Sequence, residues 1–430
     1  MALTQINSKS ITDGTIATAD IADGAVTNAK IADGTIGSAK IGTGSIAASN
    51  LNAASVTTNK IADEAVTLAK LPHGTSSNDG KFLRANNGAD PTFETVASAG
   101  KAHNLIINGS MQAAQRGTSS TGNGYQTVDR FSLYKFAIGN TLTQSQISLN
   151  STDTGPYALG FRKAYRFAAA GALTVNNNSE ISMSYKIESQ DLAKSGWDYT
   201  SSSSYITLSF WFRCSANQTF YCYLKTNDGT SQSYPFSFTA SGNNTWTKIT
   251  KTIPGDSNLQ FDDNNEEGLY MAFVPFFGTN YTGTKTLNAW SAYANDARVP
   301  DMTNDVWYDG ANTFDITGVQ LEVGSVATDF EHRSFAQEIA LCKRYFEKVM
   351  VTSFDSKSNN NHTGGASAMF AVEKRDAPTC TRISNYYEYN SGGQLTAHTI
   401  TTFAILVTCS GGGNKSQQLL SSLFHCEAEL

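Results

Sequence analysis

The sequence predicts a mostly β protein in three parts: an N-terminal trimeric fibrous β-repeat shaft, a jelly-roll β-sandwich head, and one short helix with a small β-rich C-terminal tip. Three observations lead to this fold class. A large aliphatic residue recurs at every fifth position over residues 11–71, apolar and polar residues alternate in several short runs after residue 104, and one amphipathic helical stripe follows residue 334. The resulting segments are 1–10, 11–71, 72–103, 104–333 and 334–430.

Residues 11–71 repeat with a period of ten, as in IADGAVTNAK followed by IADGTIGSAK. The five-residue spacing of the aliphatic side chains fits neither the period of a helix, about 3.6 residues, nor the period of an unbroken strand, about two. The Asp-Gly steps explain the interruption, because glycine adopts the positive φ that tight turns need. We therefore expect each repeat to be one bend plus one or two short strands. The aliphatic residues expected on the shaft axis include Ile11, Ile16, Ile21, Val26, Ile31, Ile36, Ile41 and Ile46.

A ten-residue repeat cannot close a core by itself, since ten extended residues reach at most about 33 Å of contour. Repeats that cannot bury their apolar face alone must stack or associate. The simplest arrangement is three parallel chains wound together with their aliphatic columns on a shared axis, which makes the protein a homotrimer. A collagen helix is excluded because glycine does not recur at every third position. A disordered linker, the remaining alternative, does not explain the phased aliphatic residues.

Composition argues against several classes of function. Charged residues make up 16% of the chain and the net charge is −6, so the basic stripe of a nucleic-acid-binding protein is missing. No signal peptide and no apolar run of transmembrane length is present. Six cysteines without CxxC or metal-finger spacing favour reduced thiols. The six histidines are scattered, and no nucleophile elbow, Walker loop or dinucleotide fingerprint occurs. The protein is therefore not expected to be an enzyme.

Two short segments flank the shaft. Residues 1–10 are polar and small enough to be a peptide that docks the chain on a particle. Residues 72–103 are rich in turn signals, with strand-like pieces at 82–83 and 93–96. We expect this second segment to be a collar between the shaft and the head.

The head is predicted from alternating runs that form short strands. The clearest run covers 205–214, and after a turn at 215–218 a second run covers 220–224. Alternation over two neighbouring runs is typical of an antiparallel hairpin, with Cys214 and Cys222 facing the core. Many short strands without a second helical pattern predict a β-sandwich, most simply a jelly roll. Further strands are expected at 181–187, 246–253, 269–277 and 314–321.

Ser334 opens the only helix that the sequence supports. Ser334 and Gln337 have the spacing of a capping box, and Glu338 lies off the expected apolar stripe. That stripe is expected to contain Phe335, Ile339, Cys342 and Phe346. The strands expected in the tip are 349–353, 366–372, 399–409 and 419–426.

Two parts of the sequence resemble known proteins. The IADGAVTNAKIADGTI phrasing resembles shaft segments of phage tail fibres. The runs NLIINGSM at 104–111 and FDITGVQLEVG at 314–324, taken together, resemble a carbohydrate-binding-module-like jelly roll over residues 104–346. Such jelly rolls occur in tail fibre and receptor-binding proteins of podovirus-type phages of marine and other bacteria. Phe131 stands where tryptophan is commoner in these proteins, a conservative change for a core aromatic residue.

The resemblance implies a function and partners. It implies a homotrimeric tail fibre of the virion, held by phage tail or portal-adaptor proteins through residues 1–10, that attaches outside the cell to a host surface polysaccharide or lipopolysaccharide. Jelly rolls of this type often hold a structural calcium ion near their opening Asn-Gly turn, which makes Asn108 and Asp315 the ligands to check. The acidic run 262–267 is a second calcium candidate, although a solvated loop explains it better. No other cofactor is expected.

Exposed aromatic side chains are the candidates for sugar contact, because such sites combine apolar walls with a few placed polar groups. Loops on a rigid scaffold commonly carry binding residues, so the aromatic residues of loops are preferred to those of the 205–224 strands. The preferred glycan-binding residues are Trp197, Tyr199, Trp290 and Tyr293. The less preferred strand residues, expected on one shared face, are Trp211, Tyr221 and Tyr223. There are two alternatives to sugar contact by these residues: their rings are buried, or the receptor site lies in the tip loop at 356–365.

Two other functions stay open. A tailspike depolymerase would cleave the same polymer with paired carboxylates, and a purely structural neck or decoration fibre would bind no ligand. Tailspikes of that kind usually need a long β-helix, and the chain has no repeats of about 20–25 residues after Leu71. Adhesion without cleavage is therefore the preferred prediction.

Overall fold

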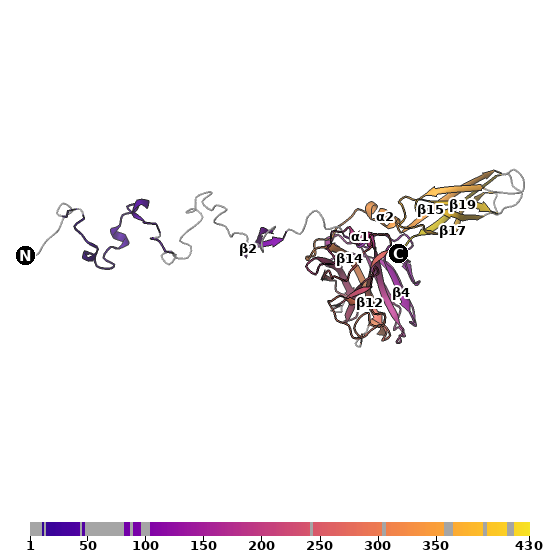
Figure 1. The fold of residues 1–430 in the computed structure, drawn as a ribbon, viewed down its shortest axis with the longest axis horizontal. Coiled ribbons are helices and arrows are strands. Elements are labelled where there is room, and N and C mark those ends of the chain that lie inside the picture. The colour runs from indigo at the N-terminus through magenta and orange to yellow at the C-terminus, as the bar shows by residue number, and fades with distance from the viewer. Residues whose placement is uncertain are drawn as a thin grey trace, which may run out of the picture. The chain divides into compact units, whose positions relative to one another are not determined.

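The computed structural model forms two compact units, Met1–Thr95 and Val96–Leu430, and Figure 1 traces the chain through both. The residues that the structure describes are 11–12, 14–43, 45–47, 81–86, 89–95, 104–240, 244–302, 307–356, 364–389, 394–410 and 417–430. The predicted docking peptide, much of the collar, the repeats after residue 47 and most of the tip loop at 356–365 lie outside these residues. The two units are described separately.

In the first unit, each described repeat consists of a β-turn followed by a 3-10 turn. The β-turns form at the Asp-Gly steps, as predicted, with Gly14, Gly24 and Gly34 at φ of 82°, 75° and 77°. The backbone N–H of Thr15 donates to the Thr12 carbonyl at 3.1 Å, and the next repeats keep this bond. The 3-10 turns are η2 (Thr18–Asp20), η3 (Asn28–Lys30) and η4 (Ser38–Lys40).

The expected short strands of the repeat are wrong for the described part of residues 11–47, which contains turns and no strand. A 3-10 turn satisfies backbone groups inside the repeat, so no neighbouring strand is needed to pair with them. The aliphatic side chains at the predicted axis positions are between 38% and 54% exposed in the single chain. One chain alone therefore leaves this apolar column uncovered.

A hairpin ends the first unit. Strand β1 (Lys81–Asn86) pairs antiparallel with β2 (Ala89–Thr95), with an irregularity between Arg84 and Asn86. The strand-like pieces predicted at 82–83 and 93–96 correspond to this hairpin.

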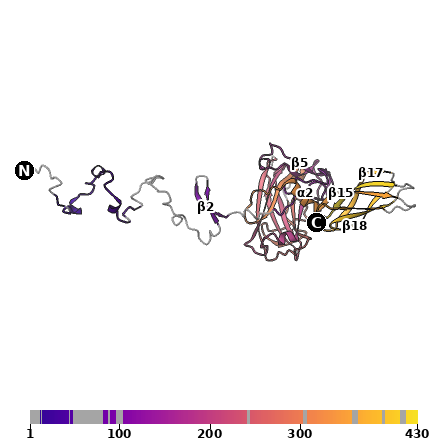
Figure 2. The same ribbon diagram turned by 90° about the horizontal axis from the view of Figure 1, so that it is seen from above.

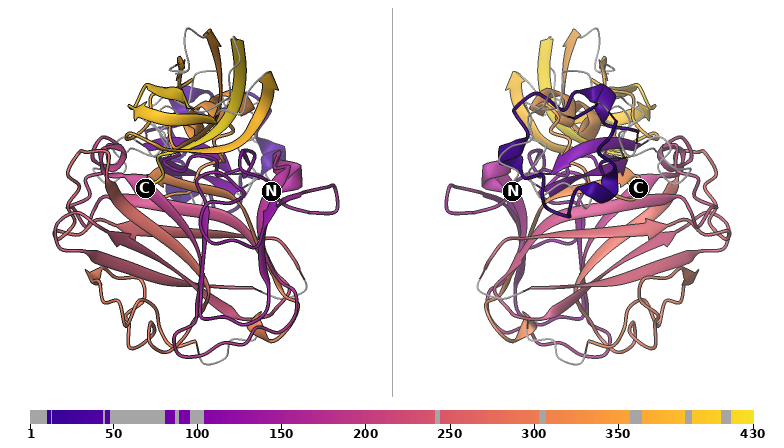
Figure 3. Two further views of the ribbon diagram at one scale, coloured as in Figure 1. Left: turned by 90° about the vertical axis from the view of Figure 1, so that its right-hand side faces the viewer. Right: turned by 90° about the vertical axis from the view of Figure 1, so that its left-hand side faces the viewer.

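The head is a sandwich of two six-stranded sheets in which every strand pair is antiparallel, and its strands are drawn in magenta to orange in Figures 2 and 3. Sheet one runs in the order β13 (Ser291–Ala292), β10 (Gln232–Thr239), β9 (Thr219–Thr226), β12 (Glu267–Phe277), β7 (Glu180–Glu188), β4 (Ser132–Phe136). Sheet two runs in the order β11 (Thr247–Pro254), β8 (Tyr205–Cys214), β14 (Thr313–Val323), β6 (Lys163–Ala169), β5 (Leu142–Ser148), β3 (Ser119–Ser120). The short helix α1 (Ser189–Ala193) follows β7, and the 3-10 turns η9 (Tyr157–Leu159) and η10 (Trp307–Asp309) lie in connections. The predicted mostly β sandwich is confirmed.

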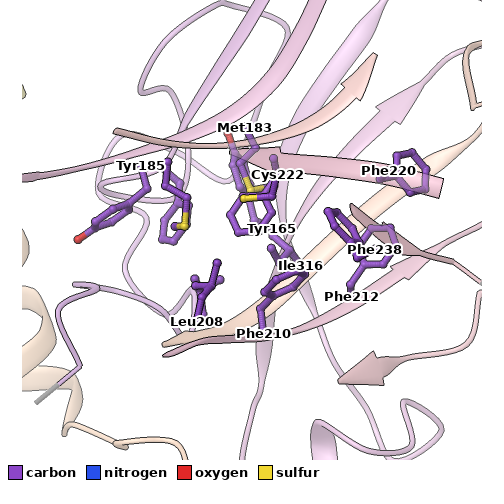
Figure 4. Close-up of a cluster of buried hydrophobic side chains, with 14 of the residues drawn as sticks. Tyr165, Met183, Tyr185, Leu208, Phe210, Phe212, Phe220, Cys222, Phe238 and Ile316 are labelled. Carbon is purple, nitrogen blue, oxygen red and sulfur yellow. The ribbon is translucent and has the colours of Figure 1, made fainter. Parts of the chain in front are cut away.

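The core of the head lies between the two sheets. Figure 4 shows Met183 and Cys222 of sheet one facing Leu208 and Phe210 of sheet two. Phe131 is fully buried in this core, as predicted for a core aromatic residue. Aromatic rings meet edge to face, for example Phe210 and Phe273 at 4.9 Å between centroids, an arrangement that adds to their burial energy.

The predicted hairpin of residues 205–224 is wrong. Strand β8 belongs to sheet two and β9 to sheet one, so the connection at 215–218 crosses the sandwich instead of turning within a sheet. Both strands show their apolar face to the core, and Cys214 and Cys222 are buried there as predicted. Alternation identifies the apolar face of a strand, but the same pattern serves a strand on either side of a core.

The two motifs that bracket the head in the sequence meet in the fold. The N–H of Leu105 donates to the Leu321 carbonyl at 2.9 Å, and the N–H of Val319 donates to the Gly109 carbonyl at 2.9 Å. A Cβ on Gly109 would lie 2.0 Å from the Val319 carbonyl oxygen, so only glycine fits. The Asn104 side chain bonds to this same β14 backbone, and the first and last parts of the head are thereby joined.

Helix α2 (Phe335–Lys343) begins at the predicted capping box, in which Ser334 and Gln337 satisfy each other's backbone N–H groups. The predicted apolar stripe is partly wrong. Phe335 is 56% exposed, whereas Glu338 is buried. Glu338 accepts a hydrogen bond from the Asn108 backbone N–H, so this face of the helix meets a turn with free donors, which a carboxylate satisfies better than an apolar ring.

The tip consists of two three-stranded sheets around a small apolar core. One sheet has the order β15 (Phe346–Ser356), β20 (Gln417–Glu427), β17 (Thr379–Tyr389), and the other β16 (Gly364–Met369), β19 (Ala404–Ser410), β18 (Gln394–Ile400). The strand predicted at 399–409 is two strands joined by a turn, and β17 was not predicted. The expectation of reduced cysteines is wrong for one pair, because Cys380 and Cys426 lie opposite each other on β17 and β20 and form a disulfide.

Two arginine side chains, one buried and one partly exposed, fix the tip to the head. The Arg130 guanidinium lies 3.4 Å from the ring centroid of Tyr345 and pairs with Glu429. Arg344 binds both carboxylate oxygens of Glu188, each at 2.8 Å. The last strand of the tip thus returns the chain to the sandwich. Within the described residues, no helix is both long and apolar enough to cross a membrane.

Candidate functional site

The outer face of sheet one carries a group of tyrosines, most of them half-buried, which we call the tyrosine face. Strands β9 and β12 turn Cys222, Leu224, Met271 and Phe273 into the core, so the alternate side chains point outward. These outward side chains form an apolar cluster separate from the core. The tyrosine face consists of Tyr221, Tyr223, Lys225, Tyr270, Tyr281 and Tyr293.

Residues 278–302 lie across this face and bury its centre. The N–H of Tyr293 donates to the Ser231 carbonyl at 2.9 Å, and the N–H of Arg298 donates to the Tyr281 carbonyl at 2.9 Å. Val299 from this segment is fully buried in the same cluster. Tyr223 is left only 2% exposed, whereas the other tyrosines of the face remain partly open to solvent.

One ion pair fastens the segment to the sheet. Nη1 of Arg298 lies 2.6 Å from Oε2 of Glu180 on β7. The remaining guanidinium donors bond to the Asn295 carbonyl and side chain, at 3.1 and 2.7 Å. The guanidinium also lies 4.6 Å from the ring centroid of Tyr281, a cation–π contact. Arg298 therefore fixes both the backbone of the segment and one ring of the tyrosine face.

The phenol groups of the face stay protonated in neutral solution. Burial raises the pKa of Tyr221, Tyr270 and Tyr293 above the ordinary tyrosine value, and burial raises the pKa of Tyr223 much further. A protonated phenol both donates and accepts hydrogen bonds. Flat rings with neutral hydroxyls on a rigid sheet are a surface suited to sugar rings and their hydroxyl groups.

Of the four preferred loop residues, only Tyr293 lies on the tyrosine face. Trp197 is 3% exposed and packs in the core, 6.2 Å from Phe261 between ring centroids, so its predicted surface position is wrong. Tyr199 is half-buried and packs edge to face against the same Phe261 at 4.9 Å. Trp290 donates from Nε1 to the Pro254 carbonyl at 2.7 Å and packs against the core.

The strand residues predicted to share one face lie on opposite sides of the head. Tyr221 and Tyr223 belong to the tyrosine face of sheet one, but Trp211 lies on the outer face of sheet two. The segment around residue 155 covers Trp211, since a Cβ on Gly155 would lie 2.6 Å from its ring. The split follows from the crossing connection between β8 and β9.

The predicted calcium ligands are engaged elsewhere. Both carboxylate oxygens of Asp315 accept hydrogen bonds from Arg166, at 2.7 and 2.8 Å, and one also accepts from Arg213 at 2.8 Å. Two guanidinium groups exclude a cation from that carboxylate. The Asn108 side chain closes its own turn through Ala113 and Asp129. Among the described residues, no three His, Cys, Asp or Glu side chains gather as a metal site requires.

The acidic run at 262–267 is likewise no cation site. Asp263 pairs with Lys194 at 2.7 Å, and Glu267 pairs with Lys186 at 2.8 Å. Asp262 accepts from the side chain of Gln260 at 2.6 Å. The carboxylates of the run thus point to separate partners, as expected for adjacent residues of an irregular loop.

Sequence reasoning missed Tyr270 and Lys225, and it named Tyr281 only as one further aromatic residue in a loop. The signal for Tyr270 was present, because it alternates with Leu269 and Met271 in a predicted strand. Its neighbours on the adjoining strands could not be found from that pattern. The sequence places Tyr281 in a loop, but it does not show that this loop lies over the sheet, since the segment has no periodic pattern.

No protein-family model and no curated protein matches this chain. Among solved structures, the chain is similar to the enzymatically active domain of bacteriophage CBA120 tailspike protein 4, with 11% identity and a TM-score of 0.28, over 51% of this chain and 21% of that one. It is also similar to a putative sugar binding protein from Bacteroides thetaiotaomicron, with 10% identity and a TM-score of 0.28, over 52% of this chain and 100% of that one. A family 11 carbohydrate-binding module of a Clostridium thermocellum cellulase matches with 12% identity and a TM-score of 0.24, over 50% of this chain and 98% of its own. Likenesses at this level leave the function to be argued from the residues of the chain itself.

Proposed function

We propose that the protein is a homotrimeric phage tail fibre that attaches the virion to a polysaccharide or lipopolysaccharide on the host cell surface through the tyrosine face. The observation that carries the proposal is the set of partly open, protonated tyrosines on a rigid antiparallel sheet. Aromatic rings of this kind stack on sugar rings, and the phenol hydroxyl groups beside them select the orientation of the bound sugar.

The uncovered aliphatic column of the repeat supports trimerisation. Large aliphatic side chains recur at a fixed spacing, and each is more than a third exposed in the single chain. A surface that covers all of them must carry apolar side chains at the same spacing along its whole length. Other copies of the same chain supply that surface. Covering apolar area contributes about 25 cal/mol per Å², so the contribution grows with each repeat, and a trimer presents three tyrosine faces that bind together with increased avidity.

The fibre is proposed to bind without cleaving. Glycoside hydrolysis needs one carboxyl group that donates a proton and a second that acts as base or nucleophile. On sheet one, Glu180 is held by Arg298 and Glu267 by Lys186. Both carboxylates are thus already engaged by a cation of the protein, so neither is free to contact a substrate as the acid.

Binding assays with substituted trimers test the proposal. Tyr281→Ala and Tyr293→Ala should each weaken polysaccharide binding by roughly 5- to 150-fold, since a stacked ring contributes about 1–3 kcal/mol in comparable stacking sites. Tyr157→Ala, which removes a half-buried ring on the side of sheet two, is the matched control. Unchanged binding by both face variants would remove the tyrosine face from the proposal, and the release of new reducing ends from the polysaccharide would show a depolymerase.

A further inference from the structure

Several charged side chains around the tyrosine face have a partner within the protein. Arg298 pairs with Glu180 at 2.6 Å, and Lys186 pairs with Glu267 at 2.8 Å. Asp301 accepts a hydrogen bond from the Thr282 hydroxyl at 2.8 Å. These contacts engage three carboxylates and two cations, and Asp296 of the same segment is exposed to solvent.

Lys225 differs from these two cations. Strand register places it in one outward row across sheet one, opposite Ser233 on β10 and opposite Tyr270 on β12, which in turn lies opposite Lys186 on β7. Within the described part of the chain, its ammonium group has no ion-pair or hydrogen-bond partner. The group lies 4.7 Å from the ring centroid of Tyr293, so it stands among the rings proposed to hold the sugar.

The surroundings already make this positive charge costly. Burial lowers the pKa of Lys225, and the neighbouring Arg298 and Lys186 lower it further, while Glu267 opposes them. Glu267 itself is bound to Lys186. A ligand that covers the face removes water from Lys225, and a buried charge without an acceptor is strongly unfavourable.

A ligand must therefore bring an acceptor to Lys225. Sugar hydroxyls also accept hydrogen bonds from an ammonium group, but only an anionic acceptor adds the attraction of an opposite charge to that bond. A carboxylate, sulfate or phosphate on the sugar would form such a bond and would also neutralise the charge of Lys225. A neutral sugar would leave that charge in place.

We infer that the glycan bound by the tyrosine face is acidic, with an anionic substituent that pairs with Lys225 while the rings of Tyr293 and Tyr281 contact the sugar. This inference rests on the proposed glycan-binding function. It adds the chemical class of the ligand, which the tyrosines alone do not define.

Paired polysaccharides test the inference with the full-length protein. The probes are polygalacturonate against the same polymer after carboxyl reduction, and dextran sulfate against dextran. The anionic member of at least one pair should bind about tenfold or more tightly, a difference that one charge-assisted bond supplies. The preference should fall in Lys225→Gln and in about 0.5 M salt, which screens the pair, and should persist in Lys248→Gln, the matched control on an exposed lysine of β11.

The outcomes separate the inference from the proposed function. Preference for polygalacturonate identifies a carboxylate as the partner of Lys225, and preference for dextran sulfate identifies a sulfate. Equal binding of charged and neutral members, or a preference unchanged by Lys225→Gln, overturns the inference and leaves glycan binding standing. Binding to none of the probes counts against the proposed function and the inference together.

Discussion

Removing the Arg298 side chain should destabilise the head and loosen the tyrosine face at the same time. The Arg298 and Glu180 side chains are 13% and 7% exposed, with 2.6 Å between Nη1 and Oε2. Arg298→Met keeps most of the apolar stem but leaves Glu180 buried opposite no cation. Breaking a buried pair from one side costs about 3–5 kcal/mol. For a domain of this size that loss corresponds to a fall in Tm of about 6–20 °C.

The double variant Glu180→Gln with Arg298→Met separates the free-energy cost of the unpaired charge from the cost of lost packing. Without either charge, the remaining cost is lost hydrogen bonding and contact, about 1–2 kcal/mol. The double variant should therefore melt above the Arg298→Met variant, although it carries one more substitution. Arg162→Met is a control on an exposed arginine that directly precedes β6 and should change stability by less than about 1 kcal/mol.

Thermal melting and polysaccharide binding measured on the same samples give the readout. We expect Arg298→Met to weaken binding even at temperatures where the head stays folded, because residues 278–302 carry Tyr281 and Tyr293 and lose their anchor. A melting temperature within about 2 °C of the unsubstituted protein, or a double variant no more stable than the single one, would refute the reasoning. Either result would mean that the pair is not a buried ion pair in solution.

Three further predictions concern other parts of the chain. Ile31→Asp should abolish trimers in a sedimentation or native mass measurement, because it places a charge on the proposed shaft axis, whereas Asn28→Asp should not. Gly109→Ala should cost about 3 kcal/mol or more in a melting experiment, since its Cβ would lie 2.0 Å from a carbonyl oxygen of β14. Gly122→Ala, which meets no atom closer than 3.4 Å, should cost far less. Burial raises the pKa of Asp129 from 3.8 to about 6. The folded state then holds this proton more tightly than the unfolded chain, so stability should fall by about 2–3 kcal/mol as the pH rises through that window, and Asp129→Asn should lack this slope.

Local chemistry explains what could be predicted from the sequence. The turns at Gly14, Gly24 and Gly34 and the capping box at Ser334 each depend on a few consecutive residues. Strand positions in the head follow from alternation within one segment, which is also a local property. The strands of the repeat were predicted wrongly because the β-branched residues occupy only short pieces between a β-turn and a 3-10 turn, and propensity in such short pieces is weak.

Contacts between distant segments explain most of what was missed. Trp197 sits in a loop rich in glycine and serine, which favours exposure, yet Phe261 and Tyr199 enclose it in the fold. Phe335 begins a stripe that fits a helix buried along one side, but the helix meets the turn at Asn108 and buries Glu338 instead. In each case a partner far away in the sequence decides which side of a local element is buried.

The tyrosine face shows why a binding surface of this kind needs the register of the sheet. Alternation already places Tyr221 and Tyr223 on one side of β9, and Tyr270 on one side of β12, but it leaves open whether these sides coincide. The antiparallel pairing of β9 with β12 sets Lys225 opposite Tyr270, and that of β12 with β7 sets Tyr270 opposite Lys186. This register places both lysines in one row. Among the described residues, Lys186 forms an ion pair with a carboxylate and Lys225 forms none. The proposed preference for an acidic glycan is therefore a property of three strands brought side by side, and a shift of one residue in either pairing would remove it.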